Sequence, residues 1–135
     1  MTRFLFSLAI VLLTAATSVS QDWYTTPNFG GGYGIHGPGG YSATATPRFD
    51  GGYNLSRSNG TSMTITPRLG GGYNYQGNDG RSSYSMPRIG GGLNYYGDYG
   101  GYSAPRIGGG YNYYGRGHEG HSTPRIGGGF NFYGR

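Results

Sequence analysis

Large apolar and aromatic side chains return at fixed places in a motif that repeats along most of the chain. With the proline of each copy as position 1, positions 3, 7 and 9 are large and apolar or aromatic in all six copies, and position 8 is Asn in five of them. The copy that begins at Pro105 reads PRIGGGYNYYG. The copies begin at Pro27, Pro47, Pro67, Pro87, Pro105 and Pro124. A regular spacing of about 20 residues indicates a repeat protein.

Each unit is expected to contain two short strands. The order large–Asn–large has a period of two, so positions 7 and 9 share one face of an extended segment while Asn faces the other way. Segments such as Ser58-Asn59-Gly60 and Asn78-Asp79-Gly80 are hairpin signals and lead into Ser- and Thr-rich stretches. Proline is expected at a strand edge, with the glycine run forming the second bend. Proline and glycine at this density argue against helices.

Composition predicts that most of the repeat region is disordered. Beyond residue 20 the chain has three Leu, five Ile, no Val and four Phe, about a tenth of its residues, whereas the whole chain has 31 Gly. That aliphatic and Phe content is below the roughly 20% that an ordinary core needs. The expected fold class is therefore low-complexity chain with short β-strands. The alternative is an all-β repeat, as a β-solenoid or a hairpin meander of about 20-residue units.

The N-terminus predicts export. Residues 1–20 read as a signal peptide, with Arg3 before the apolar run Phe4 to Ala16 and small residues before Gln21. An uncleaved anchor or a buried helix are the alternatives. Residues 21–26 form an aromatic lead-in, and residues 27–135 hold the six repeats. The mature chain is expected to be secreted and extracellular, with no membrane partner after signal removal.

None of the candidate catalytic, cofactor-binding or metal-binding motifs is expected to be functional. His118-Glu119-Gly120-His121 has its histidines three apart, whereas the helical zinc-protease motif needs them four apart. The glycine runs lack the Lys of a phosphate loop, since all ten basic residues are Arg, and there is no Cys. Without Arg3, nine Arg stand against five acids, a net charge of +4. The prediction is a non-enzyme with no cofactor and no nucleic-acid partner.

Aromatic residues and Arg are the candidate contact residues. Tyr and Arg side chains stack on one another, which predicts self-association through Tyr33, Tyr53, Tyr73, Tyr75, Tyr95, Tyr96, Tyr111, Tyr113, Tyr114, Phe130, Phe132, Tyr133, Arg68, Arg88, Arg106 and Arg125. Candidates for oxidative cross-linking are Tyr95, Tyr96, Tyr113, Tyr114 and Tyr133. Asn54 and Asn59 begin acceptor sequons for N-glycosylation.

The export signal, the excess of Gly and Tyr and the Tyr-Asn-Tyr-Tyr-Gly endings together resemble glycine- and tyrosine-rich secreted structural proteins of cuticles, eggshells and cell walls. The strand–turn–strand units also look like those of repeat-built secreted amyloids such as curli subunits. The resemblance implies a non-enzymatic matrix protein that assembles with itself or with other extracellular matrix components. Two alternatives stay open: a basic glycine-rich antimicrobial protein, and a folded β-repeat protein that binds a surface or a carbohydrate.

Overall fold

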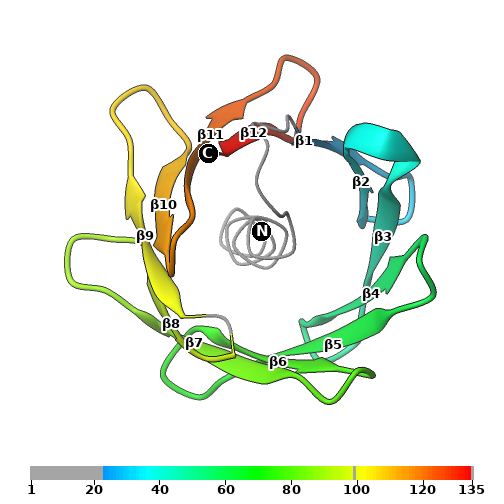
Figure 1. Cartoon of the computed structure of the whole chain (residues 1–135), viewed down its shortest axis with the longest axis horizontal. Coiled ribbons are helices and arrows are strands. Elements are labelled where there is room, and N and C mark those ends of the chain that lie inside the picture. The colour runs from blue at the N-terminus through cyan, green and yellow to red at the C-terminus, as the bar shows by residue number, and fades with distance from the viewer. Residues whose placement is uncertain (1–22, 99, 135) are drawn as a thin grey trace.

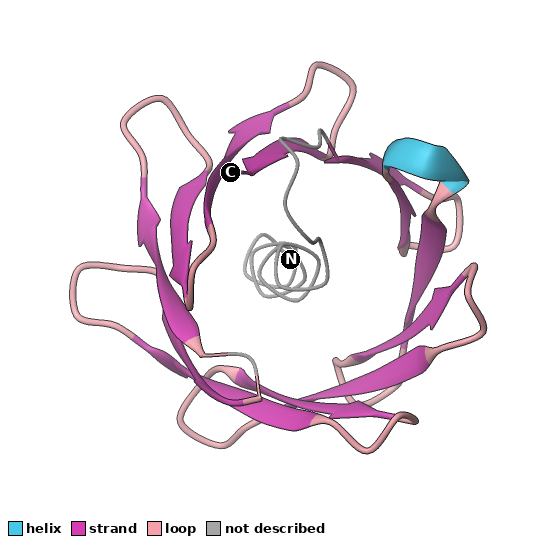
Figure 2. Ribbon diagram, in the orientation of Figure 1, coloured by secondary structure: helices cyan, strands magenta, loops and turns pink. Residues whose placement is uncertain are grey.

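The computed structural model describes residues 23–98 and 100–134, so the predicted signal peptide and the first two residues of the lead-in lie outside the described residues. The described part contains twelve β-strands and one short 3-10 turn, η1 (Pro38–Gly40) (Figure 2). The strands are β1 (Trp23–Pro27), β2 (Tyr33–His36), β3 (Ser42–Pro47), β4 (Tyr53–Arg57), β5 (Ser62–Pro67), β6 (Tyr73–Gly77), β7 (Ser82–Pro87), β8 (Leu93–Gly97), β9 (Gly101–Pro105), β10 (Tyr111–Gly115), β11 (Glu119–Pro124) and β12 (Phe130–Gly134).

The strands form one closed antiparallel barrel (Figure 1). Each strand pairs with its neighbours in sequence, and β1 pairs with β12 to complete the ring. The expectation of a mostly disordered chain is therefore wrong, and the all-β alternative is confirmed in its hairpin form. Counting aliphatic residues misled the prediction because tyrosine supplies much of the buried surface here.

The lead-in supplies the last missing strand of the repeat. A unit that begins at proline contains a turn, an even-numbered strand and the next odd-numbered strand, but the sixth unit ends after β12. Strand β1 takes that place, with Trp23 opposite Phe132 and Tyr24 opposite Asn131. The hydroxyl of Thr25 also accepts a hydrogen bond from the Phe130 amide at 2.9 Å. The two ends of the repeat array therefore complete one another.

Large side chains from one set of strands meet small ones from the other inside the barrel. Positions 7 and 9 lie on the even-numbered strands, and their buried members are Tyr33, Ile35, Tyr53, Leu55, Tyr75, Leu93, Tyr95, Tyr113, Phe130 and Phe132. The odd-numbered strands bury mostly Ala, Ser and Thr, with Trp23, Met63 and Ile65 as the large exceptions. Asn54 at position 8 is exposed, as the period of two predicts. Alternation of large and small residues lets facing layers interdigitate.

Hydroxyl groups on the odd-numbered strands satisfy polar atoms of the even-numbered strands. Ser85 Oγ accepts from the Tyr73 amide at 2.9 Å and lies 3.2 Å from the buried Tyr75 hydroxyl. Ser122 does the same for Tyr111 and Tyr113, at 3.0 and 3.3 Å. Buried polar groups need such partners, because an unpaired one costs roughly 1–3 kcal/mol. The small polar residues of the spacers are thus part of the core.

The glycine run makes the turn between each odd strand and the next even strand. Gly70, Gly71 and Gly72 all have positive φ, at 91°, 94° and 79°. A positive φ at the third residue of a four-residue turn defines type II and favours glycine. In the second copy only Gly51 of the turn is left-handed, which allows Asp50 before it. The prolines end the odd strands, as predicted.

The third glycine of each run is required by a neighbouring strand. A Cβ added to Gly110 would meet the backbone carbonyl of Ser122, and Gly110 has φ of 80°. A left-handed conformation costs a non-glycine residue about 1–2 kcal/mol, and overpacking adds about 1–3 kcal/mol. We expect Gly110→Ala to lower the free energy of unfolding in urea by at least about 2 kcal/mol. Gly30→Ala is the matched control, since nothing lies within 4 Å and its φ is not positive. Equal losses in the two variants would contradict this account.

The buried phenol of Tyr113 makes the barrel sensitive to alkali. Burial raises the pKa of Tyr113 well above its usual range, although its hydrogen bond with Ser122 opposes the rise. Since the folded state holds this proton more tightly, the phenol stabilises the barrel below the unfolded pKa of about 10, and that contribution is lost as the pH rises above it. Between about pH 9 and about pH 11, the parent should lose about 1 kcal/mol more stability than Tyr113→Phe in urea titrations. Parallel stability curves for the two proteins would show that Tyr113 is not the group involved.

Candidate functional site

Six equivalent turns stand at one end of the barrel, because each joins an odd-numbered strand to the following even-numbered strand. We call this end the tip rim; it comprises residues 28–32, 48–52, 68–72, 88–92, 106–110 and 125–129. Figure 1 shows the turns after β7, β9 and β11, in yellow-green, amber and orange, flaring away from the barrel wall. The other turns, which join even to odd strands, stand at what we call the far rim.

A large apolar side chain occupies the tip of every turn on the tip rim. These are the position 3 residues, Phe29, Phe49, Leu69, Ile89, Ile107 and Ile126, and each is fully exposed. Each is the second residue of its four-residue turn, because the amide of Gly91, for example, bonds to the carbonyl of Arg88 at 3.1 Å. A single exposed apolar residue is ordinary, but here one recurs at the same place in all six turns. The tips are therefore the leading candidate for a functional surface.

Charge is distributed unequally between the two ends of the barrel. The tip rim carries Arg48, Arg68, Arg88, Arg106 and Arg125 with one acid, Asp50, which makes +4 among the described residues. The far rim and the strand ends beside it, which we call the far end, carry equal numbers of each sign in the described part, namely Arg57, Arg81, Arg116, Asp79, Asp98 and Glu119. The apolar tips thus stand on a basic end and not on a neutral one.

Three of the five tip-rim arginines stack on the outer wall of the neighbouring hairpin. The guanidinium carbon of Arg88 lies 4.3 Å from the Tyr102 ring centre, and its Nη1 donates to the Ser103 carbonyl at 3.0 Å. Arg68 lies 4.5 Å from the Tyr84 ring in the same way. Arg125 stacks on Tyr24 at 4.6 Å and donates to Thr25 O at 3.1 Å, so the contact also joins the end of the array to β1.

Cross-strand ring pairs continue these stacks down the wall. Tyr84 stacks on Tyr96 with ring centres 5.1 Å apart, and Tyr102 stacks on Tyr114 at 4.7 Å. The equivalent pairs include histidine and are Tyr24–His36 at 4.8 Å and His121–Tyr133 at 5.0 Å. Burial, with Arg106 nearby, lowers the pKa of His121. We call these four pairs the outer aromatic belt.

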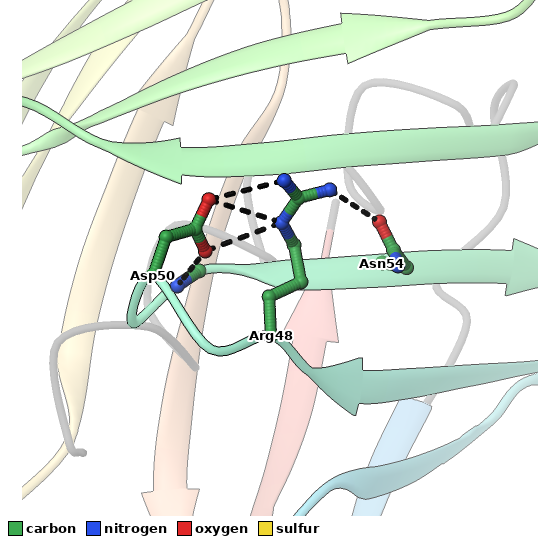
Figure 3. Close-up of polar contacts among 4 residues, drawn as sticks. Arg48, Asp50 and Asn54 are labelled. Carbon is green, nitrogen blue, oxygen red and sulfur yellow. Dashed lines mark hydrogen bonds and ion pairs between the residues drawn. The ribbon is translucent and has the colours of Figure 1, made fainter.

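The belt is interrupted over β3–β6, where its positions hold Thr44, Ser56, Thr64 and Gln76. Arg48 has no ring to stack on, and its guanidinium contacts Asp50 at 3.0 Å and Asn54 Oδ1 at 3.2 Å within its own unit (Figure 3). The hydrogen bond from Arg48, helped by the Gly52 amide, holds the pKa of Asp50 below its usual value. A shallow depression of about 550 Å³, lined mainly by small polar residues, lies on this part of the barrel.

The predicted self-association residues separate into a buried and a surface group. Buried in the barrel are Tyr33, Tyr53, Tyr75, Tyr95, Tyr113, Phe130 and Phe132, and packed against that core are Tyr73 and Tyr111. The surface group consists of Tyr96, Tyr114, Tyr133, Arg68, Arg88, Arg106 and Arg125. The buried side chains present almost no surface to a second molecule while the barrel is folded. Self-association stays a prediction for the surface group.

The candidate modification sites divide in the same way. Of the predicted cross-linking residues, Tyr95 and Tyr113 are buried, whereas Tyr96, Tyr114 and Tyr133 lie on the outer wall. Both sequon asparagines are exposed. Asn59 Oδ1 accepts from the Thr61 amide at 3.0 Å in a far-rim turn, and Asn54 Oδ1 accepts from Arg48.

Among the described residues, no group of three or more His, Cys, Asp or Glu is placed to hold a metal ion. The segment 118–121 enters β11, where Glu119 and His121 lie two residues apart on one strand. The described part of the chain also has no helix long and apolar enough to cross a membrane.

Sequence reasoning missed two features of the surface. Position 3 shares its apolar character with positions 7 and 9, so the tips were not distinguished from the core. The aromatic residue three places before a motif proline, as in Tyr24, Tyr84, Tyr102 and His121, was available in the sequence and marks the belt.

Comparison of the chain with protein-family models finds no match, and comparisons with curated proteins and with solved structures find none either.

The stacking of Arg88 on Tyr102 should be measurable as a coupling energy. Cation–π pairs contribute about 0.5–1 kcal/mol at partly exposed sites. A double-mutant cycle of Arg88→Ala and Tyr102→Ala, followed by urea unfolding, should give a coupling of that size. The equivalent positions Arg48 and Thr64 have no ring and are the matched control, for which we expect additive losses. Additivity at Arg88 and Tyr102 would mean that the stack does not stabilise the barrel.

Proposed function

We propose that this chain is an exported, non-enzymatic barrel that attaches to a surface through its tip rim. The observation that carries the proposal is the set of six fully exposed apolar tips at one end of the barrel. The turn itself does not need them, because the second residue of a type I or type II turn accepts most residue types. Large apolar side chains at all six tips therefore suit binding better than folding.

The barrel gives the tips the geometry of a multivalent anchor. Each tip alone can bury one side chain, which stabilises a complex by about 1.5–3 kcal/mol at most. Six tips on one closed ring engage together, since the first contact places the others near the same surface. A closed sheet keeps their relative positions fixed and leaves no edge strand to pair with another chain.

The outer wall supports the competing functions less well. Assembly through the repeat aromatics would have to use the surface group alone. Carbohydrate binding needs open ring faces, but a guanidinium at 4.5 Å and a second ring at 5.1 Å both lie against the faces of Tyr84. Each ring of the outer aromatic belt thus has at least one face covered by another ring.

The proposal can be tested by adsorption of the mature chain, residues 21–135, which contains all the described strands. We expect binding to an alkyl-coated sensor surface and none to a dextran-coated one. Replacing three tips together, by Ile89→Asn, Ile107→Asn and Ile126→Asn, should weaken binding at least about tenfold, because each removes buried apolar area.

Tyr96→Asn with Tyr114→Asn is the control, since both rings lie on the wall. This variant should keep its affinity, and circular dichroism should show the same β spectrum for all proteins at every concentration. A wall variant that loses more binding than the tip variant would overturn the proposal. Concentration-dependent assembly that survives the tip substitutions would instead support the matrix function.

A further inference from the structure

We propose that the surface recognised by the tip rim is an anionic lipid bilayer. This inference rests on the proposed function and names its partner class. Apolar tips next to basic side chains match the two layers of such a surface, an acyl interior beneath acidic headgroups.

The charge distribution points to lipid. The tip rim holds +4, whereas the far end is balanced within the described residues. Near an anionic membrane, each basic residue strengthens binding by about fivefold, which corresponds to about 1 kcal/mol. The charge is placed where the apolar tips are, so both contributions act at the same contact.

The arginines lie at a suitable depth behind the tips. Arg88 directly precedes the tip residue Ile89, and its guanidinium stacks on Tyr102, three residues before the proline that ends β9. Three strand residues span about 10 Å, so the charge lies within about that distance of the rim. Interfacial apolar groups enter a bilayer by about 5–10 Å. Tips inserted to that depth would leave the guanidinium groups at or near the headgroups, within about a Debye length of 8 Å.

A second copy of the barrel is the competing occupant of the tip rim. Two tip rims facing each other would place +4 against +4, and like charges at close range repel. The flared turns also separate the six tips around the ring (Figure 1). Separate anchors enter a fluid layer independently, whereas a protein partner would need a matching pocket for each one.

The inference departs from the sequence-based expectation of no membrane partner. That expectation considered only segments that could span a bilayer. Docking on the bilayer surface needs no spanning segment and uses residues whose exposure the sequence did not reveal.

Vesicle co-sedimentation of the mature chain tests the inference. We expect binding to vesicles of phosphatidylcholine mixed with phosphatidylglycerol, little binding to phosphatidylcholine alone, and weakening by added salt. The triple variant Ile89→Asn, Ile107→Asn and Ile126→Asn should lower the partition coefficient at least about thirtyfold. Arg88→Gln with Arg106→Gln should lower it about tenfold or more.

Two controls test whether binding depends on where the arginines lie and whether each variant keeps its fold. Arg81→Gln with Arg116→Gln removes the same charge from the far end and should leave binding within about twofold of the parent at raised ionic strength. Circular dichroism melts of every variant check that the barrel is intact, and the fully exposed tips make unfolding of the triple variant unexpected.

Each other outcome overturns the inference in a recognisable way. Equal losses for the two arginine pairs, or unchanged binding of the tip variant, would mean general electrostatic adsorption. A dimer in sedimentation equilibrium that the tip substitutions dissolve, without vesicle binding, would assign the tip rim to a second copy. Tip-dependent binding to the alkyl surface without vesicle binding would reject the lipid partner and leave the proposed function standing. Loss of both would reject the proposed function as well.

Discussion

Closure of the sheet is the constraint on which the rest of this structure depends. A meander of short hairpins has two open edges, and unpaired strand edges invite pairing with other chains. Here both edges are removed by one contact, between β1 and β12. The Thr25 hydroxyl, bonded to the Phe130 amide, reproduces at this junction what Ser85 and Ser122 do within the array. The seam is therefore built like the other junctions.

Closure also explains how a chain poor in aliphatic residues encloses a core. In a closed ring one face of every strand lies in the interior, so even small side chains on that face become fully buried. Eight strands already leave an interior just wide enough for side chains to fill, and twelve give a wider one. The even-numbered strands place large rings in this interior, namely Tyr75, Tyr113 and Phe132. The odd-numbered strands contribute small side chains, such as Ala45, Ser103 and Ser122, which leave room for those rings. Tyrosine side chains therefore fill much of the interior of a wide barrel that has few Leu and Ile.

Much of the local structure could be predicted from sequence, and the closed ring could not. The period of two around Asn54, the Asn59-Gly60 turn and the proline at each strand end all gave correct local structure. The composition did not predict an ordered fold, because the rule applied to it counts Leu, Ile, Val and Phe but not Tyr. Closure could not be predicted as long as Trp23-Tyr24-Thr25-Thr26 counted as a lead-in separate from the repeats. The lead-in nevertheless matches the end of a repeat: Tyr24-Thr25 is separated from Pro27 by one residue, just as Tyr102-Ser103 is separated from Pro105 by one residue. Exposure of the tips depends on turn geometry, which the apolar character of position 3 does not encode.

The tip residues stand out when the positions of the repeat unit are compared by the role that each plays in the barrel. Gly110 avoids the Ser122 carbonyl, Tyr113 fills the interior, and Arg88 covers Tyr102. Ile107 contributes to none of these, yet the equivalent residue is large and apolar in every copy. Exposing such a side chain to water is unfavourable by about 25 cal/mol per Å² relative to burying it. A feature that recurs six times without serving the fold is best explained by contact with something outside it, and the arginines that accompany it favour an acidic partner.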